Sequence, residues 1–170
     1  MKNLILLLIS LQCLNSSCKK PNQDYSGEAH VLMNKSRYIN RLVAYTVKGK
    51  LTFGLKQFEK VGGIQVERRS LSFAILDFSE AKQNLVRDSL LPRCLFTTSQ
   101  DDGCVVGDFF VLDSTAGLAN YFKINKQENN YKEIWGEFNV KLLRISNCNC
   151  TDLPDNVNFT NGTFHIVLKD

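Results

Sequence analysis

The sequence predicts an all-β protein: an antiparallel β-sandwich or small flattened barrel of about eight strands, with one short helix. Three observations support this fold class. Large apolar residues alternate with small or polar residues in several runs, Gly-centred turns separate the runs, and the runs recur about every 10 to 15 residues. No internal repeat or second domain boundary interrupts the pattern, so we expect a single β domain.

The N-terminal segment has the composition of an export signal. Lys2 provides a positive charge, and residues 4–11 form an apolar run much shorter than the roughly 20 residues that span a bilayer. No later run approaches that length, so no transmembrane helix is expected. Small residues precede Cys18, an arrangement that bacterial lipoprotein processing recognises. We therefore expect cleavage after Ser17, acylation of Cys18 and attachment to a membrane through the acyl chains.

Two other interpretations stay open. An ordinary signal peptidase prefers a small residue three positions before the cut, where a cut near Cys18 would place Asn15 or Leu14. A eukaryotic secreted glycoprotein is the third interpretation, because four Asn-x-Ser/Thr triplets are present. They begin at Asn34, Asn149, Asn158 and Asn161. A chain rich in Asn, Ser and Thr produces such triplets by chance, so lipidation is favoured.

Residues 18–27 are expected to be the lipidated cysteine and a polar tether, and residues 28–170 to be the β domain. The chain has 21 Lys and Arg residues and 17 Asp and Glu residues, and removal of Lys2 with the leader leaves 20 − 17 = +3. This small excess is spread along the chain, so no nucleic-acid partner is expected. Lys19 and Lys20 favour an anionic lipid surface.

Strands and turns are predicted from the alternation. Four runs place large apolar side chains on one face of a strand. They cover residues 51–55, 71–75, 138–142 and 164–168. Gly-containing pairs at 48–49, 62–63 and 102–103 mark turns between apolar runs. Asn161-Gly162 predicts a two-residue hairpin turn, and a bulge within one longer strand is the competing interpretation.

One helix is expected over residues 79–90. Ser79 is suited to the N-cap position, and Pro92 would stop the helix. The apolar residues that would share one side of this helix are Ala81, Leu85, Val86 and Leu90.

Four segments carry a family resemblance: Ser17-Cys18-Lys19-Lys20, Asp108–Asp113, Gly136–Val140 and Val157–Phe164. Together they resemble small, functionally uncharacterised β-rich lipoproteins of Bacteroidetes-type bacteria, in which a Gly-x-Phe strand is followed by a closing Asn/Asp-Gly-x-Phe strand. The resemblance implies a β-sandwich-like body facing the periplasm or the cell surface, and it carries over no catalytic residue. In such bacteria, acidic residues directly after the lipidated cysteine can mark a lipoprotein for export to the cell surface. Here basic residues follow Cys18, which favours the periplasmic face of the outer membrane.

Four cysteines lie outside the leader and the lipidation site: Cys94, Cys104, Cys148 and Cys150. An even number in an exported domain predicts disulfides, with three connectivities open. A bond between Cys94 and Cys104 would staple the polar loop between them. Cys148 and Cys150 are separated by one residue, so a bond between them would be strained, and cross-pairing with the other two is also open. Free thiols and a Cys₄ metal site are the alternatives, although the spacings fit zinc poorly.

No catalytic motif is present, and no carboxylate partner is evident that would join His30 and His165 in a metal site. We expect no cofactor and no metal. The predicted function is that of a lipid-anchored, monomeric envelope protein without catalytic activity, which binds a protein partner or a small ligand through its β surface. Candidate ligand-lining residues are Tyr121, Tyr131 and Trp135, with cross-strand packing as the alternative.

A lipocalin-like carrier of a small apolar ligand is the second hypothesis, and an enzyme is the third. An interior cavity of several hundred Å³ would favour the carrier, whereas a filled core would argue against it. Buried acids with shifted pKa values in a cleft would favour the enzyme.

Overall fold

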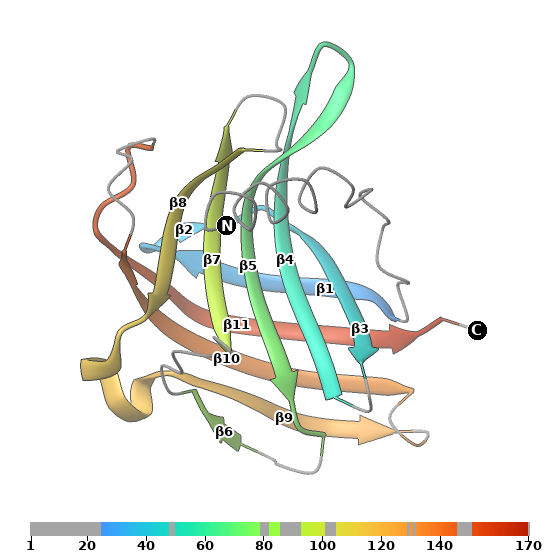
Figure 1. Ribbon diagram of the computed structural model, residues 1–170. Helices are drawn as coiled ribbons and strands as arrows, with labels where there is room; N and C mark the ends of the chain where they lie inside the picture. The colour runs from blue at the N-terminus through green and yellow to red at the C-terminus, as the bar shows by residue number, and fades with distance from the viewer. Residues whose placement is uncertain are drawn as a thin grey trace, which may run out of the picture.

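The computed structural model describes residues 25–47, 50–78, 82–85, 93–100, 105–128, 130, 132–145 and 151–169. This part of the chain is an eight-stranded antiparallel closed barrel with three additional strands, which confirms the predicted all-β class (Figure 1). The elements are β1 (Tyr25–Met33), β2 (Ser36–Arg37), β3 (Arg41–Val47), β4 (Lys50–Val61), β5 (Ile64–Leu76), β6 (Lys82–Asn84), β7 (Cys94–Gln100), β8 (Val105–Leu112), the 3-10 helix η1 (Ser114–Ala119), β9 (Tyr121–Glu128), β10 (Glu133–Arg144) and β11 (Asn156–Leu168).

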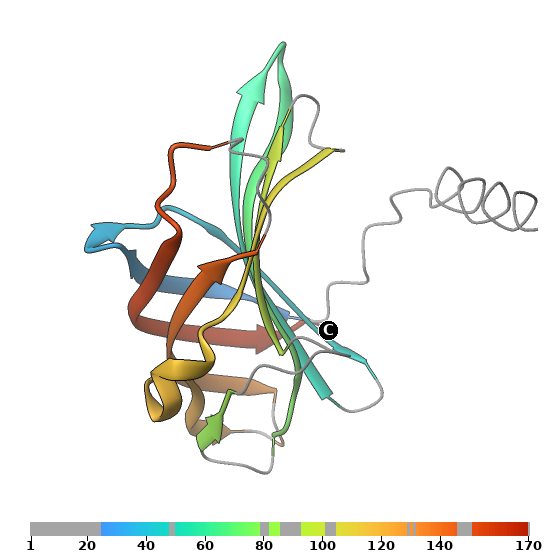
Figure 2. The same cartoon turned by 60° about the vertical axis from the view of Figure 1, so that its left-hand side comes forward.

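The barrel wall is a ring of strands in the order β11-β1-β3-β4-β5-β7-β8-β10, and β10 pairs with β11 to close it. β2 pairs with β1, whereas β9 and β6 continue outward from β10. In Figure 1 the strands β1, β11, β10 and β9 run across the direction of β4, β5 and β7, so the barrel is flattened into two crossing layers. Figure 2 shows the β4–β5 hairpin rising beyond one end of the barrel.

Gly62 and Gly63 form the turn of this hairpin, as the sequence predicts. Both have positive φ, 56° and 89°, which a tight turn joining two adjacent antiparallel strands requires. The strands on either side of the turns expected at 48–49 and 102–103 pair with each other in antiparallel fashion, but the turn residues themselves lie outside the described part of the chain.

β1 begins three residues before the predicted start of the domain. Tyr25 is 4% exposed, packs in the core and pairs with both Leu168 and Ala44. The tether predicted over residues 18–27 is therefore too long at its C-terminal end, because Tyr25–Gly27 belong to β1.

The interior of the barrel is filled with phenylalanine rings. Within one cluster, Phe53 contacts Phe164 at a centroid distance of 4.8 Å and Phe73 contacts Phe138 at 5.0 Å. In a second cluster, Phe96 contacts two further rings at 5.4 and 5.1 Å. The eight buried rings, none more than 4% exposed, are those of Phe53, Phe73, Phe96, Phe110, Phe122, Phe138, Phe159 and Phe164. The predicted apolar faces thus point into the barrel, where the rings pack against one another.

Two Gly-x-Phe sequences pack against each other where β10 meets β11. Gly136 pairs with Phe164, and Phe138 pairs with Gly162. Each ring lies over the opposite glycine, because a Cβ added to Gly136 would overlap the Phe164 ring, and one added to Gly162 would overlap the Phe138 ring. The two glycines therefore provide the space that two core rings occupy.

Asn161 and Gly162 lie in a β-bulge and do not form a hairpin turn. β11 runs from Asn156 to Leu168, and its register against β10 shifts by one residue between Phe138 and Val140. Asn161 has a φ of 54°, a conformation that Asn tolerates better than most residues. β11 stays extended because β1 pairs with one of its edges and β10 with the other. Of the two interpretations of this sequence, the bulge is the one confirmed.

The helix predicted over residues 79–90 is wrong where the structure describes this segment. Lys82–Asn84 form β6, which pairs with the edge of β9. The Gln83 side chain accepts a hydrogen bond from the Asp77 N–H at 2.9 Å and donates one to the Asp77 carbonyl at 2.7 Å. Leu85 is buried, and its N–H donates to the Asn120 carbonyl at 2.9 Å. These non-local bonds outweigh the helical periodicity. The short helical element of the described chain is η1, which Asp113 caps.

We expect Gly136→Ala to lower the free energy of unfolding by about 1–3 kcal/mol, because the added methyl group would overlap both the Phe164 ring and the main-chain carbonyl of Lys123. Gly54→Ala is the matched control, since Gly54 is also buried in a strand but an added Cβ there would meet its nearest neighbours at 3.7 Å, an ordinary contact distance. Urea unfolding of both variants gives the difference. Equal losses of stability would contradict the proposed role of Gly136.

Candidate functional site

β1, β2 and β3 form one long hairpin whose arms separate in the middle. At one end Leu32 pairs with Arg37, and the Tyr38 N–H donates to the Val31 carbonyl at 3.0 Å. At the other end Tyr25 pairs with Ala44. Between these points, residues 26–30 and 39–43 share no ladder pair in the described structure. We call the gap between these two segments the slit.

An inserted residue does not cause the slit. The segments 25–31 and 38–44 both span seven positions, so the arms would be in register if the ladder continued. The Asn40 side chain lies between them instead. Its Nδ2 donates to the Tyr38 carbonyl at 2.9 Å and makes a longer contact of 3.4 Å to the Ala29 carbonyl. Asn40 therefore takes the place of main-chain bonds and holds the arms apart.

Two polar atoms of residues that line the slit are buried without a hydrogen-bond partner among the described residues: Asn40 Oδ1 and the Tyr38 hydroxyl. The Tyr38 ring packs edge-on against Phe159 at 5.4 Å and fixes one end of the slit. Burial raises the pKa of the Tyr38 phenol, which is thus neutral at physiological pH. Because buried polar atoms are normally hydrogen-bonded, Asn40 Oδ1 is an unsatisfied acceptor, which a ligand donor would reach only if the arms of the slit move.

The slit opens into a groove of about 490 Å³ on the barrel wall. Exposed cationic side chains from the β2–β3 arm and from the C-terminal end line it: Arg37, Arg41 and Lys169. Glu28 is the one acidic residue of the lining, and its carboxylate lies 3.9 Å from His30. The lining is therefore polar with a positive excess.

A second groove of about 390 Å³ adjoins the first. Both are lined by Ile39, Asn40 and Arg41, and the second continues to Lys56 and Phe58 at the base of the β4–β5 hairpin. Ile39 is 72% exposed, an unusual position for a large apolar side chain. The two grooves share Ile39, Asn40 and Arg41 and thus form one continuous surface, with the exposed Ile39 beside the basic slit.

The aromatic residues predicted to line a ligand site lie elsewhere. Trp135 stacks on His165 at 4.6 Å with an interplanar angle of 6°, and Lys126 lies 4.7 Å from its ring centre. Tyr121 is covered by Lys82 at 4.8 Å. Both aromatic residues are on β9 and β10 outside the two grooves, where their contacts agree with the alternative of cross-strand packing. Tyr131 lies outside the described residues.

Cys94 is a free, buried thiol within the described chain, and burial raises its pKa. Cys18, Cys104, Cys148 and Cys150 lie outside the described residues, so lipidation of Cys18 and all the disulfide pairings stay predictions.

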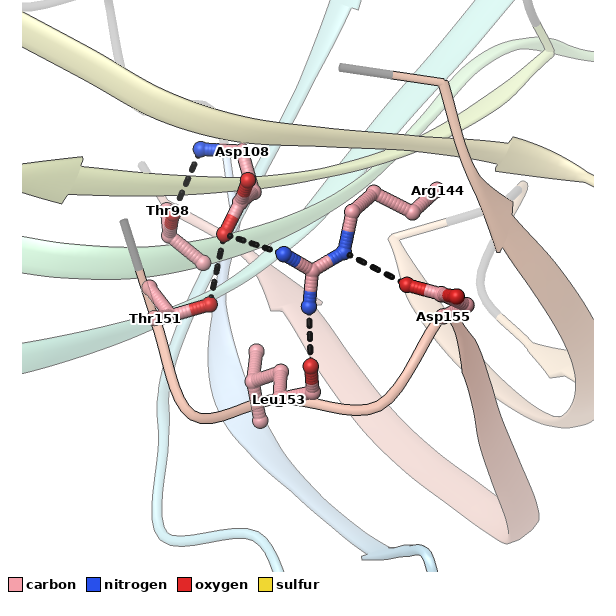
Figure 3. Close-up of polar contacts among 6 residues, drawn as sticks. All are labelled: Thr98, Asp108, Arg144, Thr151, Leu153 and Asp155. Atoms are coloured by element: carbon pink, nitrogen blue, oxygen red, sulfur yellow. Dashed lines mark hydrogen bonds and ion pairs between the residues drawn. The ribbon is translucent and has the colours of Figure 1, made fainter. Parts of the chain in front are cut away.

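Figure 3 shows a buried ion pair at the end of β10. Asp108 is fully buried, and the Arg144 side chain is 7% exposed. Asp108 Oδ2 lies 3.2 Å from Arg144 Nη1 and accepts a hydrogen bond from Thr151 Oγ1 at 2.6 Å. Arg144 Nη2 donates to the Leu153 carbonyl, and the guanidinium lies 5.2 Å from the Phe110 ring centre.

This ion pair has a structural role. β8 and β10 share only three ladder pairs, and we call such a junction between two neighbouring strands of the ring a seam. Arg144 links the segment before β11 to this seam through its bond to the Leu153 carbonyl. Arg144 Nε is 3.4 Å from Asp155 Oδ1, which satisfies the distance for an ion pair but not the geometry of a hydrogen bond. Neither Asp108 nor Arg144 lines the two grooves described above.

No family model, curated protein or solved structure matches this chain. In the part of the chain that the structure describes, no three His, Cys, Asp or Glu side chains gather as metal ligands. No helix there is long and apolar enough to cross a membrane. The slit is therefore identified from its geometry alone. It has no signal in the sequence, because neither the missing ladder pairs nor the contacts of Asn40 are local.

We expect Asp108→Asn to lower the free energy of unfolding by about 3 kcal/mol, because it leaves the buried Arg144 guanidinium without its paired charge. Asp155→Asn is the matched control: it removes a second carboxylate beside Arg144, but that carboxylate is 87% exposed, and the loss should stay below about 1 kcal/mol. Chemical denaturation of both variants tests this difference. A larger loss in Asp155→Asn would reverse the assignment.

Proposed function

We propose that this chain is a lipid-anchored, non-catalytic protein of the cell envelope that binds a partner at the slit between β1 and β3. The observation that carries the proposal is the slit itself. Two arms of equal length are held apart by Asn40, whose Oδ1 is buried without a partner among the described residues. A fold optimised for stability alone would continue the ladder and satisfy these groups, whereas a binding site leaves them for its ligand.

The filled interior supports binding on the wall over the lipocalin-like alternative. A carrier of that type needs an internal cavity for its apolar ligand. Here the eight buried phenyl rings lie inside the barrel and contact one another within two clusters. The grooves at the slit are instead open and partly polar, which suits a protein segment better than a hydrocarbon.

The membrane attachment in this proposal rests on the sequence around Cys18. The acyl chains would hold a single, monomeric β domain at the outer membrane, on its periplasmic face. Few residues separate Cys18 from Tyr25, where β1 begins, so the domain would be held close to the lipid surface.

We expect radioactive palmitate to label the wild-type protein and Cys13→Ala, and to be lost from Cys18→Ala. Cys13 is the matched control because it is also a cysteine of the leader, five positions before Cys18, and is removed by the expected cleavage. The measurement is autoradiography of the immunoprecipitated protein. Label that persists in Cys18→Ala would contradict the lipid anchor.

We expect a photo-crosslinking residue, p-benzoylphenylalanine, to capture a partner protein from the intact cell envelope when it replaces Ile39. Ile145 is the matched control, since it is an exposed isoleucine (55%) that lines neither groove. The readout is a slower band on an immunoblot after irradiation. Absence of the band at position 39, or the same band from both positions, would contradict partner binding at the slit.

A further inference from the structure

We infer that the slit binds a short acidic segment of a partner protein in extended conformation, an inference that rests on the proposed function and names the chemistry of the partner. Three features support it: the direction of the main-chain groups of β1, the unpaired Asn40 Oδ1, and the charge of the rim. Each feature is met by a different part of such a segment.

The main-chain groups of β1 point into the slit at alternate residues. Tyr25 pairs with Ala44 of β3, and the Val31 carbonyl accepts a hydrogen bond from the Tyr38 N–H. Main-chain groups alternate in direction along a strand, so every second residue of β1 between positions 25 and 31 directs its N–H and C=O groups toward β3. Those residues are Gly27 and Ala29, of which the Ala29 carbonyl is already contacted by Asn40 Nδ2 at 3.4 Å. Their side of β1 shares no ladder pair over this stretch of the described structure. An extended peptide presents donors and acceptors at the matching spacing.

Asn40 adds a buried acceptor to this edge. Its Nδ2 is used by the Tyr38 and Ala29 carbonyls, which leaves Oδ1 as the atom without a partner among the described residues. A peptide N–H is a donor of the required kind, whereas a carboxylate or phosphate oxygen is not. This atom therefore favours a peptide main chain over a simple anion.

The rim selects for negative charge. Arg37, Arg41 and Lys169 are exposed and make no ion pair with a described residue, and Glu28 is the one carboxylate of the lining. Because the rim carries three cations and one anion, it favours a bound segment with acidic side chains. In an extended segment these would point to the rim at every second residue, and the residues between them would face the slit. The exposed Ile39 at the junction with the second groove offers contact to one apolar side chain.

The dimensions of the slit favour a short segment over the edge of a second folded copy. The slit is closed at both ends, by Tyr25 with Ala44 and by Val31 with Tyr38. The five intervening positions of β1 extend over roughly 17 Å, the length of about five residues in a strand. The edge of another barrel is flanked by its own neighbouring strand and would collide with the arm that carries Ile39.

Fluorescence anisotropy of labelled hexapeptides tests the inference with the mature, detergent-solubilised protein. The acidic probe alternates Glu and Val, the basic probe alternates Lys and Val, and the third probe is the acidic sequence with N-methyl groups on alternate main-chain nitrogens. We expect the acidic probe to bind at least tenfold more tightly than either of the others. Equal binding of acidic and basic probes, or no binding of the acidic probe at millimolar concentration, would overturn the inference.

Insensitivity to N-methylation would also overturn it, because the slit would then act as a general anion site. Arg41→Gln should weaken the acidic probe at least fivefold, and Asn40→Ala should do the same without loss of folding, which urea unfolding verifies. Lys123→Gln, on the outer face of β9, is the control and should leave binding unchanged. A partner captured at position 39 together with no acidic preference would remove this inference but leave the proposed function in place. If no partner is captured at position 39 and no acidic preference is found, both this inference and the proposed function are overturned.

Discussion

The reciprocal packing of two glycines and two phenylalanines between β10 and β11 is the constraint on which the rest of the barrel depends. Gly136 lies under Phe164 and Gly162 lies under Phe138, at the strand pair that closes the ring. With side chains in place of the glycines, neither ring could reach the core cluster around Phe53. The barrel therefore closes around aromatic rings, and ligand binding is expected on its wall.

Support for the slit comes from the opposite edge of β1. β1 pairs with β11 from Tyr25 to Met33, and β11 pairs in turn with β10. One edge of β1 is thus held by the most extensively paired part of the barrel, which allows its other edge to lack partners without fraying. A rigid strand with an open edge is the arrangement that strand addition requires, because the receptor then loses little conformational entropy on binding.

The sequence predicts those features that are local. Alternation identifies the strands at 51–55 and 138–142 because burial in a strand repeats every two residues within the segment itself. The error over 79–90 has a non-local cause, since Gln83 is held by Asp77 and Leu85 by Asn120. Trp135 was a candidate for lining a groove on the basis of residue type alone, with cross-strand packing as the other interpretation, and its surroundings, His165 and Lys126, come from other strands. The slit exists because main-chain ladder pairs are missing between two arms of equal length, and no residue type in the sequence predicts that such pairs will be missing.

The two weakest seams of the ring differ in a way that separates structure from function. β8 and β10 share three ladder pairs, and a buried ion pair with the further polar partners Thr151, Leu153 and Asp155 reinforces that seam. β1 and β3 share one ladder pair, and there the side chain of Asn40 holds the strands apart and leaves an acceptor unsatisfied. An unsatisfied buried polar atom costs about 1–3 kcal/mol, and continued main-chain pairing between β1 and β3 would remove that cost. If closure of the barrel were the only requirement, we would therefore expect the β1–β3 seam to be reinforced as the β8–β10 seam is. The cost is instead maintained at a basic, accessible groove, where a bound segment can offset it. The contrast between the seams therefore supports the proposal that the slit binds a partner.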